Sequence, residues 1–196
     1  LETQIKAGAF ESDTAELGSV GNAEKRHTLP PLRGQIYSYR LVQIPGAPAL
    51  RINIGFGIYL DVALAGLTNV RAGQLVVSNK NREKYTFETV EGRKAAYYSY
   101  RARVLSVIDG DTLWLDIDCG FGVWAKQKVR LRGIDAPELA TAEGVRSRDF
   151  VVQALKDVEF VAVTTTKPDK YDRYLADVFY FVEENNGQTV LTDGVF

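Results

Sequence analysis

The chain has 196 residues and a net charge of −1, with 45% of its residues hydrophobic and 25% charged. This composition is that of a globular protein with room for one large or two small cores, and it excludes a global basic field as the means of attracting a polyanion. No stretch is apolar over the roughly 18 residues that a membrane span needs. The sequence contains no Met and begins at Leu1, which indicates a fragment or a processed form.

Cysteine and histidine each occur once, as Cys119 and His27. A single cysteine cannot form an intramolecular disulfide or a thiolate zinc cluster. His27 lies in a polar segment next to prolines, so neither a histidine base nor a histidine-rich metal site is supported. The available chemistry is therefore that of carboxylates, Arg, Lys, Tyr, Ser and Thr.

Residues 1–34 are polar and have no sustained period, which predicts a tail or linker. From Gln35 onward the chain alternates in short stretches separated by Gly- and Pro-rich turns, and no helical period is evident. We therefore predict a small all-β module over residues 35–95. Its expected strands are 36–42, 50–54, 58–64, 74–77 and 85–90.

The second half, residues 96–196, combines strands with one helix. Its expected strands are 102–107, 112–118, 123–132, 158–166 and 175–182, and its expected helix is 142–156. Three strands, a helix and two strands is the element order of a five-stranded oligonucleotide-binding (OB-fold) barrel. The predicted fold class is mainly β (α+β), with this barrel preceded by the smaller module. Residues 183–192 are predicted to form an enlarged loop, followed by the start of another strand.

Short matches between the two halves occur in the same order along the chain. Hairpins often reuse glycines and aromatics, but four ordered matches favour a diverged internal duplication. The matches are Tyr37–Arg40 with Tyr98–Arg101, Gly55–Tyr59 with Gly120–Trp124, Leu64–Leu67 with Leu131–Ile134, and Lys84–Tyr85 with Lys170–Tyr171.

An acidic turn, Asp109-Gly110-Asp111-Thr112, separates two expected strands of the second half. Taken alone, it predicts an ordinary hairpin turn, because Asp-Gly is common in turns. In the first half, Pro45–Pro48 stands at the corresponding place and carries no charge. A functional role for the acidic turn depends on charged residues further along the chain.

A second cluster follows the end of the strand over 123–132. Arg130 and Arg132 are expected on one face of that strand, and Asp135 and Glu138 follow where the chain leaves it. Carboxylates brought together from separate segments suit a hard cation such as Ca²⁺ or Mg²⁺ rather than Zn²⁺. An arginine beside them suits a phosphate, which it can bind through two hydrogen bonds.

A third charged segment, residues 169–175, contains Lys170, Tyr171 and Arg173. It is either a solvated loop or a second group of phosphate contacts. Together, the acidic turn, the segment Arg130–Glu138 and this third segment resemble the three signatures of the staphylococcal nuclease (thermonuclease) family, over about residues 98–182. The resemblance implies an OB-fold barrel and an endonuclease that hydrolyses DNA and RNA, usually with Ca²⁺, leaving 3′-phosphate ends.

The resemblance also implies a metal site. Asp111 and Asp135 match the family's metal-ligating carboxylates, and Ala136 matches the position that ligates through its backbone carbonyl. Asp109 matches a nearby carboxylate that supports these ligands without binding the metal itself. The expected cofactor is one Ca²⁺ ion, with other divalent cations as alternatives.

The remaining family roles fall on the substrate side. Glu138 matches the residue assigned as general base, and Arg130 and Arg173 match the pair that binds the scissile phosphate. Lys170 and Tyr171 match contacts to a neighbouring phosphate. The expected partner is therefore a DNA or RNA substrate.

Two features depart from the family. No helices are expected after residue 182, where the family has them, and the near-neutral charge predicts weak non-specific binding. The alternative function is a non-catalytic OB-type module that binds nucleic acid or protein. For the first half we expect no catalysis, and three roles remain: a nucleic-acid platform using Tyr37, Tyr39 and Tyr59, a packing partner for the barrel, or simple core aromatics.

Overall fold

The computed structural model describes residues 30–62, 66–82, 84–90, 96–168, 174–181 and 186–195, and every structural statement below concerns those residues. The helices are α1 (Ala142–Leu155) and α2 (Gly187–Asp193). The strands are β1 (Gly34–Ile36), β2 (Ser38–Val42), β3 (Arg51–Gly55), β4 (Ile58–Asp61), β5 (Leu75–Asn81), β6 (Lys84–Val90), β7 (Ala96–Val107), β8 (Thr112–Asp118), β9 (Trp124–Leu131), β10 (Val161–Pro168) and β11 (Tyr174–Phe179).

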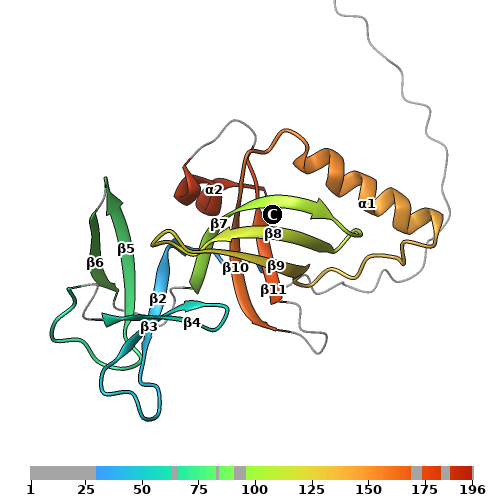
Figure 1. The fold of residues 1–196 in the computed structure, drawn as a ribbon. Coiled ribbons are helices and arrows are strands. Elements are labelled where there is room, and N and C mark those ends of the chain that lie inside the picture. The colour runs from blue at the N-terminus through green and yellow to red at the C-terminus, as the bar shows by residue number, and fades with distance from the viewer. Residues whose placement is uncertain are drawn as a thin grey trace, which may run out of the picture.

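Strands β7 to β11 form a closed barrel in the order β7-β10-β11-β9-β8, and β8 pairs back with β7. All neighbours in the barrel are antiparallel except β11 and β9, which are parallel. The predicted five-stranded barrel is therefore confirmed. Strand β1 extends the same sheet by pairing in parallel with β7. Figure 1 shows the barrel with α1 and α2 beside it.

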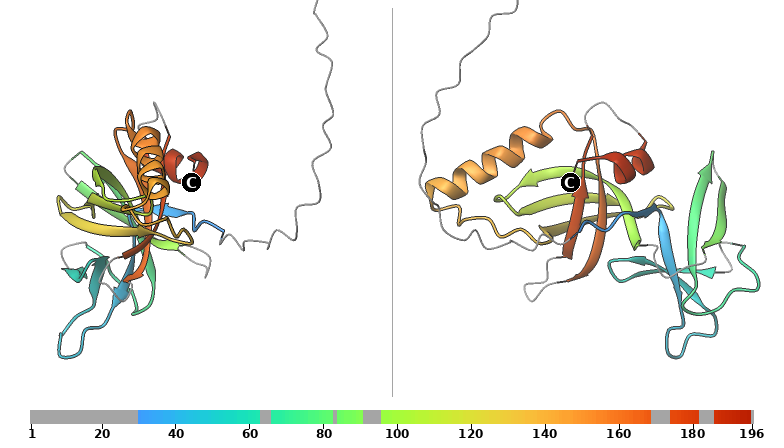
Figure 2. Two further views of the ribbon diagram at one scale, coloured as in Figure 1. Left: turned by 90° about the vertical axis from the view of Figure 1, so that its right-hand side faces the viewer. Right: turned by 180° about the vertical axis from the view of Figure 1, so that it is seen from behind.

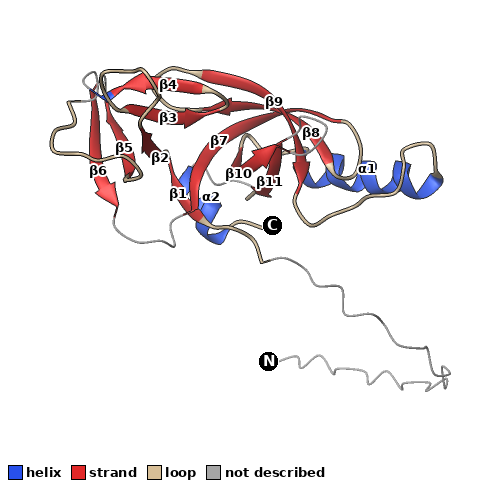
Figure 3. Cartoon of the chain, turned by 90° about the horizontal axis from the view of Figure 1, so that it is seen from below, coloured by secondary structure: helices blue, strands red, loops and turns tan. Residues whose placement is uncertain are grey.

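Strands β2 to β6 form a second, antiparallel sheet in the order β4-β3-β2-β5-β6. We call it the open sheet, because β4 and β6 do not pair within the described residues. It confirms the extra all-β module expected before the barrel. The open sheet lies at the end of the barrel opposite α1, as the views in Figures 1, 2 and 3 agree.

The alternation of side chains along the strands explains the barrel core. In β8, Leu113, Leu115 and Ile117 are fully buried, whereas Trp114 and Asp116 between them are partly exposed. Period-two alternation of this kind places one apolar face inside a barrel and one polar face outside. Burying that inner row stabilises the fold by about 1.5–3 kcal/mol per large aliphatic side chain.

Both helices begin at side-chain caps. The Thr141 side chain accepts a hydrogen bond from Gly144 N at the start of α1, and Asn186 caps α2 in the same way. Helix α2 corrects the sequence analysis, since residues 187–193 were expected to be mostly loop and no helix was expected after residue 182. Asn186 is the signal that was missed, because Asn is a favoured N-cap residue. Neither helix is long and apolar enough, in the part of the chain described, to cross a membrane.

Two tyrosine hydroxyls join the open sheet to the barrel. Tyr39 of β2 donates to the backbone carbonyl of Cys119 at 2.9 Å, and Tyr100 of β7 donates to the carbonyl of Ile54 at 2.7 Å. Both rings are fully buried in one core that spans the two sheets. We call this reciprocal pair the tyrosine clasp. The expected packing between the two halves is thus present, and Tyr39 is a core aromatic rather than a nucleic-acid platform.

Candidate functional site

The acidic turn links β7 to β8 and is held by its own backbone. Ile108 N donates to Thr112 O at 2.9 Å, and Asp111 N donates to the Asp109 carboxylate at 3.0 Å. A Cβ on Gly110 would lie 2.0 Å from the Ser147 hydroxyl of α1, so a larger residue would push the turn away from the helix. The Asp-Gly-Asp sequence therefore serves close packing against α1 as well as turn formation.

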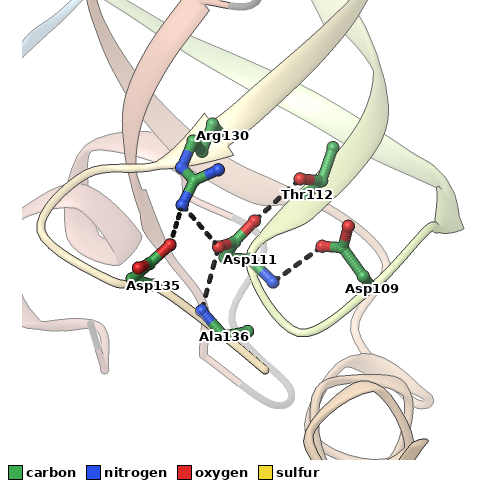
Figure 4. A network of polar contacts seen from close by, with 6 residues as sticks. All are labelled: Asp109, Asp111, Thr112, Arg130, Asp135 and Ala136. Carbon is green, nitrogen blue, oxygen red and sulfur yellow. Dashed lines mark hydrogen bonds and ion pairs between the residues drawn. The ribbon is translucent and has the colours of Figure 1, made fainter. Parts of the chain in front are cut away.

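Three groups fix the carboxylate of Asp111, which is only 4% exposed. One oxygen accepts from the Thr112 hydroxyl at 2.8 Å. The other accepts from Ala136 N at 3.0 Å and pairs with Arg130 Nη2 at 2.9 Å. Figure 4 shows these contacts converging on Asp111 from the turn, from β9 and from the loop after β9. A buried carboxylate with this many donors is held in one orientation.

Arg130 connects the turn to the second acidic segment. The same Nη2 atom that pairs with Asp111 also pairs with Asp135, whose side chain is 92% exposed. Two carboxylates from separate segments therefore face one positive group (Figure 4). Their mutual repulsion is offset by that guanidinium, and a divalent cation would offset it in the same way.

Glu138 lies in the loop between β9 and α1, two residues after Ala136. Its backbone carbonyl accepts from the Thr141 hydroxyl at 2.8 Å, and a Cβ on Gly144 would lie 2.0 Å from the same carbonyl oxygen. The loop is thus packed directly on the first turn of α1. The Glu138 side chain itself is exposed and makes no hydrogen bond or ion pair with any residue that the structure describes. It could therefore contact a water molecule or a substrate without losing a partner among the described residues.

Arg132 does not join Arg130, although strand periodicity had placed both on one face. Strand β9 ends at Leu131, and the Arg132 guanidinium makes two hydrogen bonds, of 2.8 and 2.7 Å, to Asp177. Asp177 is fully buried. The same arginine also donates to the backbone carbonyl of Pro30. Arg132 is therefore a structural residue that ties the chain before β1 to the barrel.

The structure brings together five of the predicted site residues, namely Asp109, Asp111, Arg130, Asp135 and Ala136. Lys170, Tyr171 and Arg173 fall in residues 169–173, outside the described part of the chain. Sequence reasoning assigned no role to Thr112 or Ser147. The glycines at positions 110 and 144 were the available signal for the helix contact, because a Cβ at either position would clash with the segment packed against it.

The possible metal ligands in this network are carboxylate oxygens, without a thiolate or an imidazole. Ligands of this type suit a hard cation. No group of three or more His, Cys, Asp or Glu side chains in the described residues is arranged to hold a metal. An ion here would therefore depend on Asp111 and Asp135, on backbone oxygen and on water. Ca²⁺ accepts such mixed oxygen ligands.

Two comparisons with known proteins show similarity to nucleases. A family model described as staphylococcal nuclease homologue matches residues 128–195. A micrococcal nuclease of Shigella flexneri is 36% identical to this chain over 103 residues, which are 50% of this chain and 53% of that protein. The chain thus spans about half the length of this curated relative. The resemblance drawn from the three sequence motifs is confirmed.

Proposed function

We propose that the protein is a metal-dependent nuclease acting on DNA, RNA or both. The ground is that the second half of the chain is similar to staphylococcal nuclease homologues. The observation that carries the proposal is the convergence of Asp111 and Asp135 on Arg130. A barrel that only bound nucleic acid would have no need to hold two carboxylates together in a site that must attract a polyanion. A bound cation would offset the repulsion between the two carboxylates and so explain why they lie close together.

In this proposal, Asp111, Asp135 and the backbone carbonyl of Ala136 would hold one Ca²⁺, and Asp109 would support Asp111 through its backbone amide. The bound ion would supply positive charge for the phosphate and for a coordinated water. Phosphodiester hydrolysis concentrates negative charge on the oxygens around phosphorus, so a pre-positioned cation site is worth several kcal/mol of barrier.

The side chains of the protein would do the remaining work. Arg130 and Arg173 would bind the scissile phosphate and stabilise its charge as water attacks phosphorus. Glu138 would accept a proton from that water, which is a role its free, exposed carboxylate is suited to. The bond to the 5′ oxygen would break, and this oxygen would take up a proton from solvent, leaving a 3′-phosphate and a 5′-hydroxyl. Lys170 and Tyr171 would contact a neighbouring phosphate.

The test is digestion of single-stranded DNA, plasmid DNA and RNA in the presence of Ca²⁺ or a chelator, followed by end-group analysis. We expect cleavage only with the metal and 3′-phosphate ends. Glu138→Gln should lower the rate about 10²-fold or more. The matched control is Glu143→Gln, which removes another exposed carboxylate, in the first turn of α1, that pairs with Arg146.

Binding of nucleic acid without metal-dependent cleavage, by a protein that is folded, would replace this proposal with the non-catalytic alternative. Equal losses for Glu138→Gln and Glu143→Gln would show that Glu138 has no special role.

A further inference from the structure

The outer face of the barrel carries a row of cations that begins at Arg130. In β9, Lys126, Lys128 and Arg130 alternate with Ala125 and Val129, which are buried. The three cations therefore point away from the core on the same face of the strand. Trp124, which is 46% exposed, occupies the next position of this row. From Trp124 to Arg130 the row extends about 20 Å at the usual rise of a strand.

Aromatic rings interleave with these cations. The ammonium groups of Lys126 and Lys128 lie 5.4 and 5.8 Å from the ring centroid of Trp114 on the neighbouring β8. The Arg103 guanidinium lies 5.0 Å from the ring centroid of Trp124. These contacts favour positions of the cationic groups close to the sheet surface, which lowers the entropic cost of binding a ligand there.

At its far end, the row meets a cleft of about 370 Å³ between the barrel and the open sheet. Trp124 and Arg101 line the cleft from the barrel, and Lys80 and Tyr85 line it from the open sheet. The Arg101 guanidinium also lies 3.9 Å from the ring centroid of Phe160. This contact holds the positive charge of Arg101 beside the cleft, where it favours an anionic ligand.

Acidic groups on this surface are fewer. Asp116 lies between Arg103 and Lys126 in the strand register. Asp118 also lines the cleft, but its two oxygens accept hydrogen bonds from the Tyr37 hydroxyl and from Gly120 N. The face and the cleft therefore have a positive balance, although the chain as a whole has a net charge of −1.

We propose that this face and cleft form a binding track for single-stranded nucleic acid, which leads from the site at Arg130 to the cleft between the two sheets. Alternating cations and exposed aromatic rings are what a single strand needs, because the cations bind its phosphates and the rings stack on its unpaired bases. The second and third strands of an OB-fold are a usual place for such contacts, and here these are β8 and β9. The track rests on the proposed function only for its starting point at Arg130. It also assigns the open sheet a role, since Lys80 and Tyr85 come from it.

The two tryptophans of the chain, Trp114 and Trp124, both lie on the track, so their fluorescence reports on it directly. Titration with a 12-nucleotide oligothymidylate in a chelating buffer should quench this fluorescence without any cleavage. A four-nucleotide oligomer, which is too short to reach from Arg130 into the cleft, should bind at least 10-fold more weakly. A 12-base-pair duplex should compete poorly, because its bases are already stacked.

The variant Lys80→Gln/Lys126→Gln should weaken binding of the 12-mer at least 10-fold. The slope of log affinity against log salt should fall by about 1.4, since each phosphate contact to a single strand contributes about 0.7. Lys156→Gln, an exposed lysine at the end of α1, is the matched control and should change neither quantity. Unchanged 12-mer affinity in the double variant would overturn the track, and equal binding of the duplex would overturn its assignment to single strands.

The outcome for the track is separable from that for the nuclease. Metal-dependent cleavage of the 12-mer that is unaffected by Lys80→Gln/Lys126→Gln would retain the nuclease and reject the track. Loss of 12-mer binding in that variant, in a protein that cleaves nothing with any metal, would retain the track and reject the nuclease.

Discussion

The barrel and the open sheet share one strand plan but differ in what they can hold. The order β9-β8-β7-β10-β11 of the barrel is the order β4-β3-β2-β5-β6 of the open sheet. Gly55 N bonds to the Asn53 side chain at 3.0 Å, and Gly120 N bonds to the Asp118 side chain at 2.9 Å. The same frame has therefore been built twice, and an internal duplication is the interpretation we favour.

Closure is the first difference. The barrel closes because Val129–Leu131, the last part of β9, pairs in parallel with β11. In the open sheet, β4 ends at Asp61, whose counterpart in β9 is Lys126, so the segment that would close it lies beyond the end of the strand. The site residue Arg130 belongs to the extra length of β9. A longer third strand thus closes the barrel and also places Arg130 beside Asp111.

The acidic turn is the second difference. The open sheet has a neutral turn after β2, in which Ala47 N bonds to Ile44 O, and no helix packs on it in the described residues. The strand frame and the tyrosine clasp therefore hold the two sheets together, whereas the turn, the end of β9 and α1 hold the candidate site. Substitutions in the two groups of elements should therefore have different effects.

Asp111→Asn should lower metal-dependent cleavage about 10²-fold or more, because it removes a charge from the proposed cation site. Asp61→Asn, which alters an acid of the open sheet that pairs with Arg51, should leave the rate within twofold. Initial rates on a single-stranded substrate, with circular dichroism as the check of folding, measure both. Similar rates for Asp111→Asn and the parent protein would contradict the proposed role of Asp111 in cleavage.

Arg132→Ala should destabilise the fold by about 3–5 kcal/mol, since it leaves the fully buried Asp177 without its cation. Arg51→Ala removes a partly exposed ion pair of the open sheet and should cost about 0–1 kcal/mol. Guanidinium denaturation of the two variants measures the contrast. A small loss for Arg132→Ala would mean that this arginine is not the structural residue described above.

Alanine at Gly55 or Gly120 should cost about 2–4 kcal/mol. The new Cβ would lie 2.3 or 2.5 Å from a hydroxyl of the tyrosine clasp, at φ values of +91° and +79°. Gly57 and Gly122 have the same kind of φ, +76° at both, but open space around them. Alanine there should cost only about 1 kcal/mol. In thermal melts, Gly55→Ala and Gly120→Ala should therefore show similar large losses of stability. Gly57→Ala and Gly122→Ala should show similar small losses.

Alkaline pH should weaken the fold gradually. Burial raises the pKa of the Cys119 thiol from 9.0 to about 12, and burial likewise raises the pKa of Tyr39 and of Tyr100 above 10. Between pH 9 and about 12 the folded state keeps the Cys119 proton that the unfolded state loses, so stability falls as pH rises. Each such group contributes up to about 1.4 kcal/mol per pH unit.

Denaturation midpoints measured from pH 8 to 11 test this expectation, and Cys119→Ala should flatten the decline. A midpoint that stays constant over this range would contradict the burial of these groups at the junction of the two sheets.

The sequence predicted most strands because their periods are short and local, and it predicted the barrel because its element order is specific. It did not predict α2, which begins at a single Asn cap, or the Arg132–Asp177 pair, which joins residues far apart in the chain. The fourth sequence match also needs correction. Tyr85 contacts Phe121 at 4.6 Å and Tyr174 contacts Phe56 at 4.8 Å, so Tyr85 corresponds to Tyr174 rather than Tyr171.

For the site, the motifs identified the acidic turn and the segment after β9 because their charges are unusual at strand ends. Their contacts could not be foreseen in the same way. Whether Arg130 meets Asp111, Asp135 or both depends on the closure of the barrel and on how α1 presses on Gly110. Such contacts are set by packing over long sequence distances, which a local pattern does not encode.

The most direct test of the account is the Ca²⁺-dependent cleavage rate of Arg130→Lys compared with Arg51→Lys. Lysine keeps the charge beside Asp111 but loses the planar group that binds a phosphate through two hydrogen bonds. We expect Arg130→Lys to lower the rate about 10²-fold or more and Arg51→Lys to stay within twofold of the parent protein. Equal rates for the two variants would contradict the claim that the chemistry resides at Arg130.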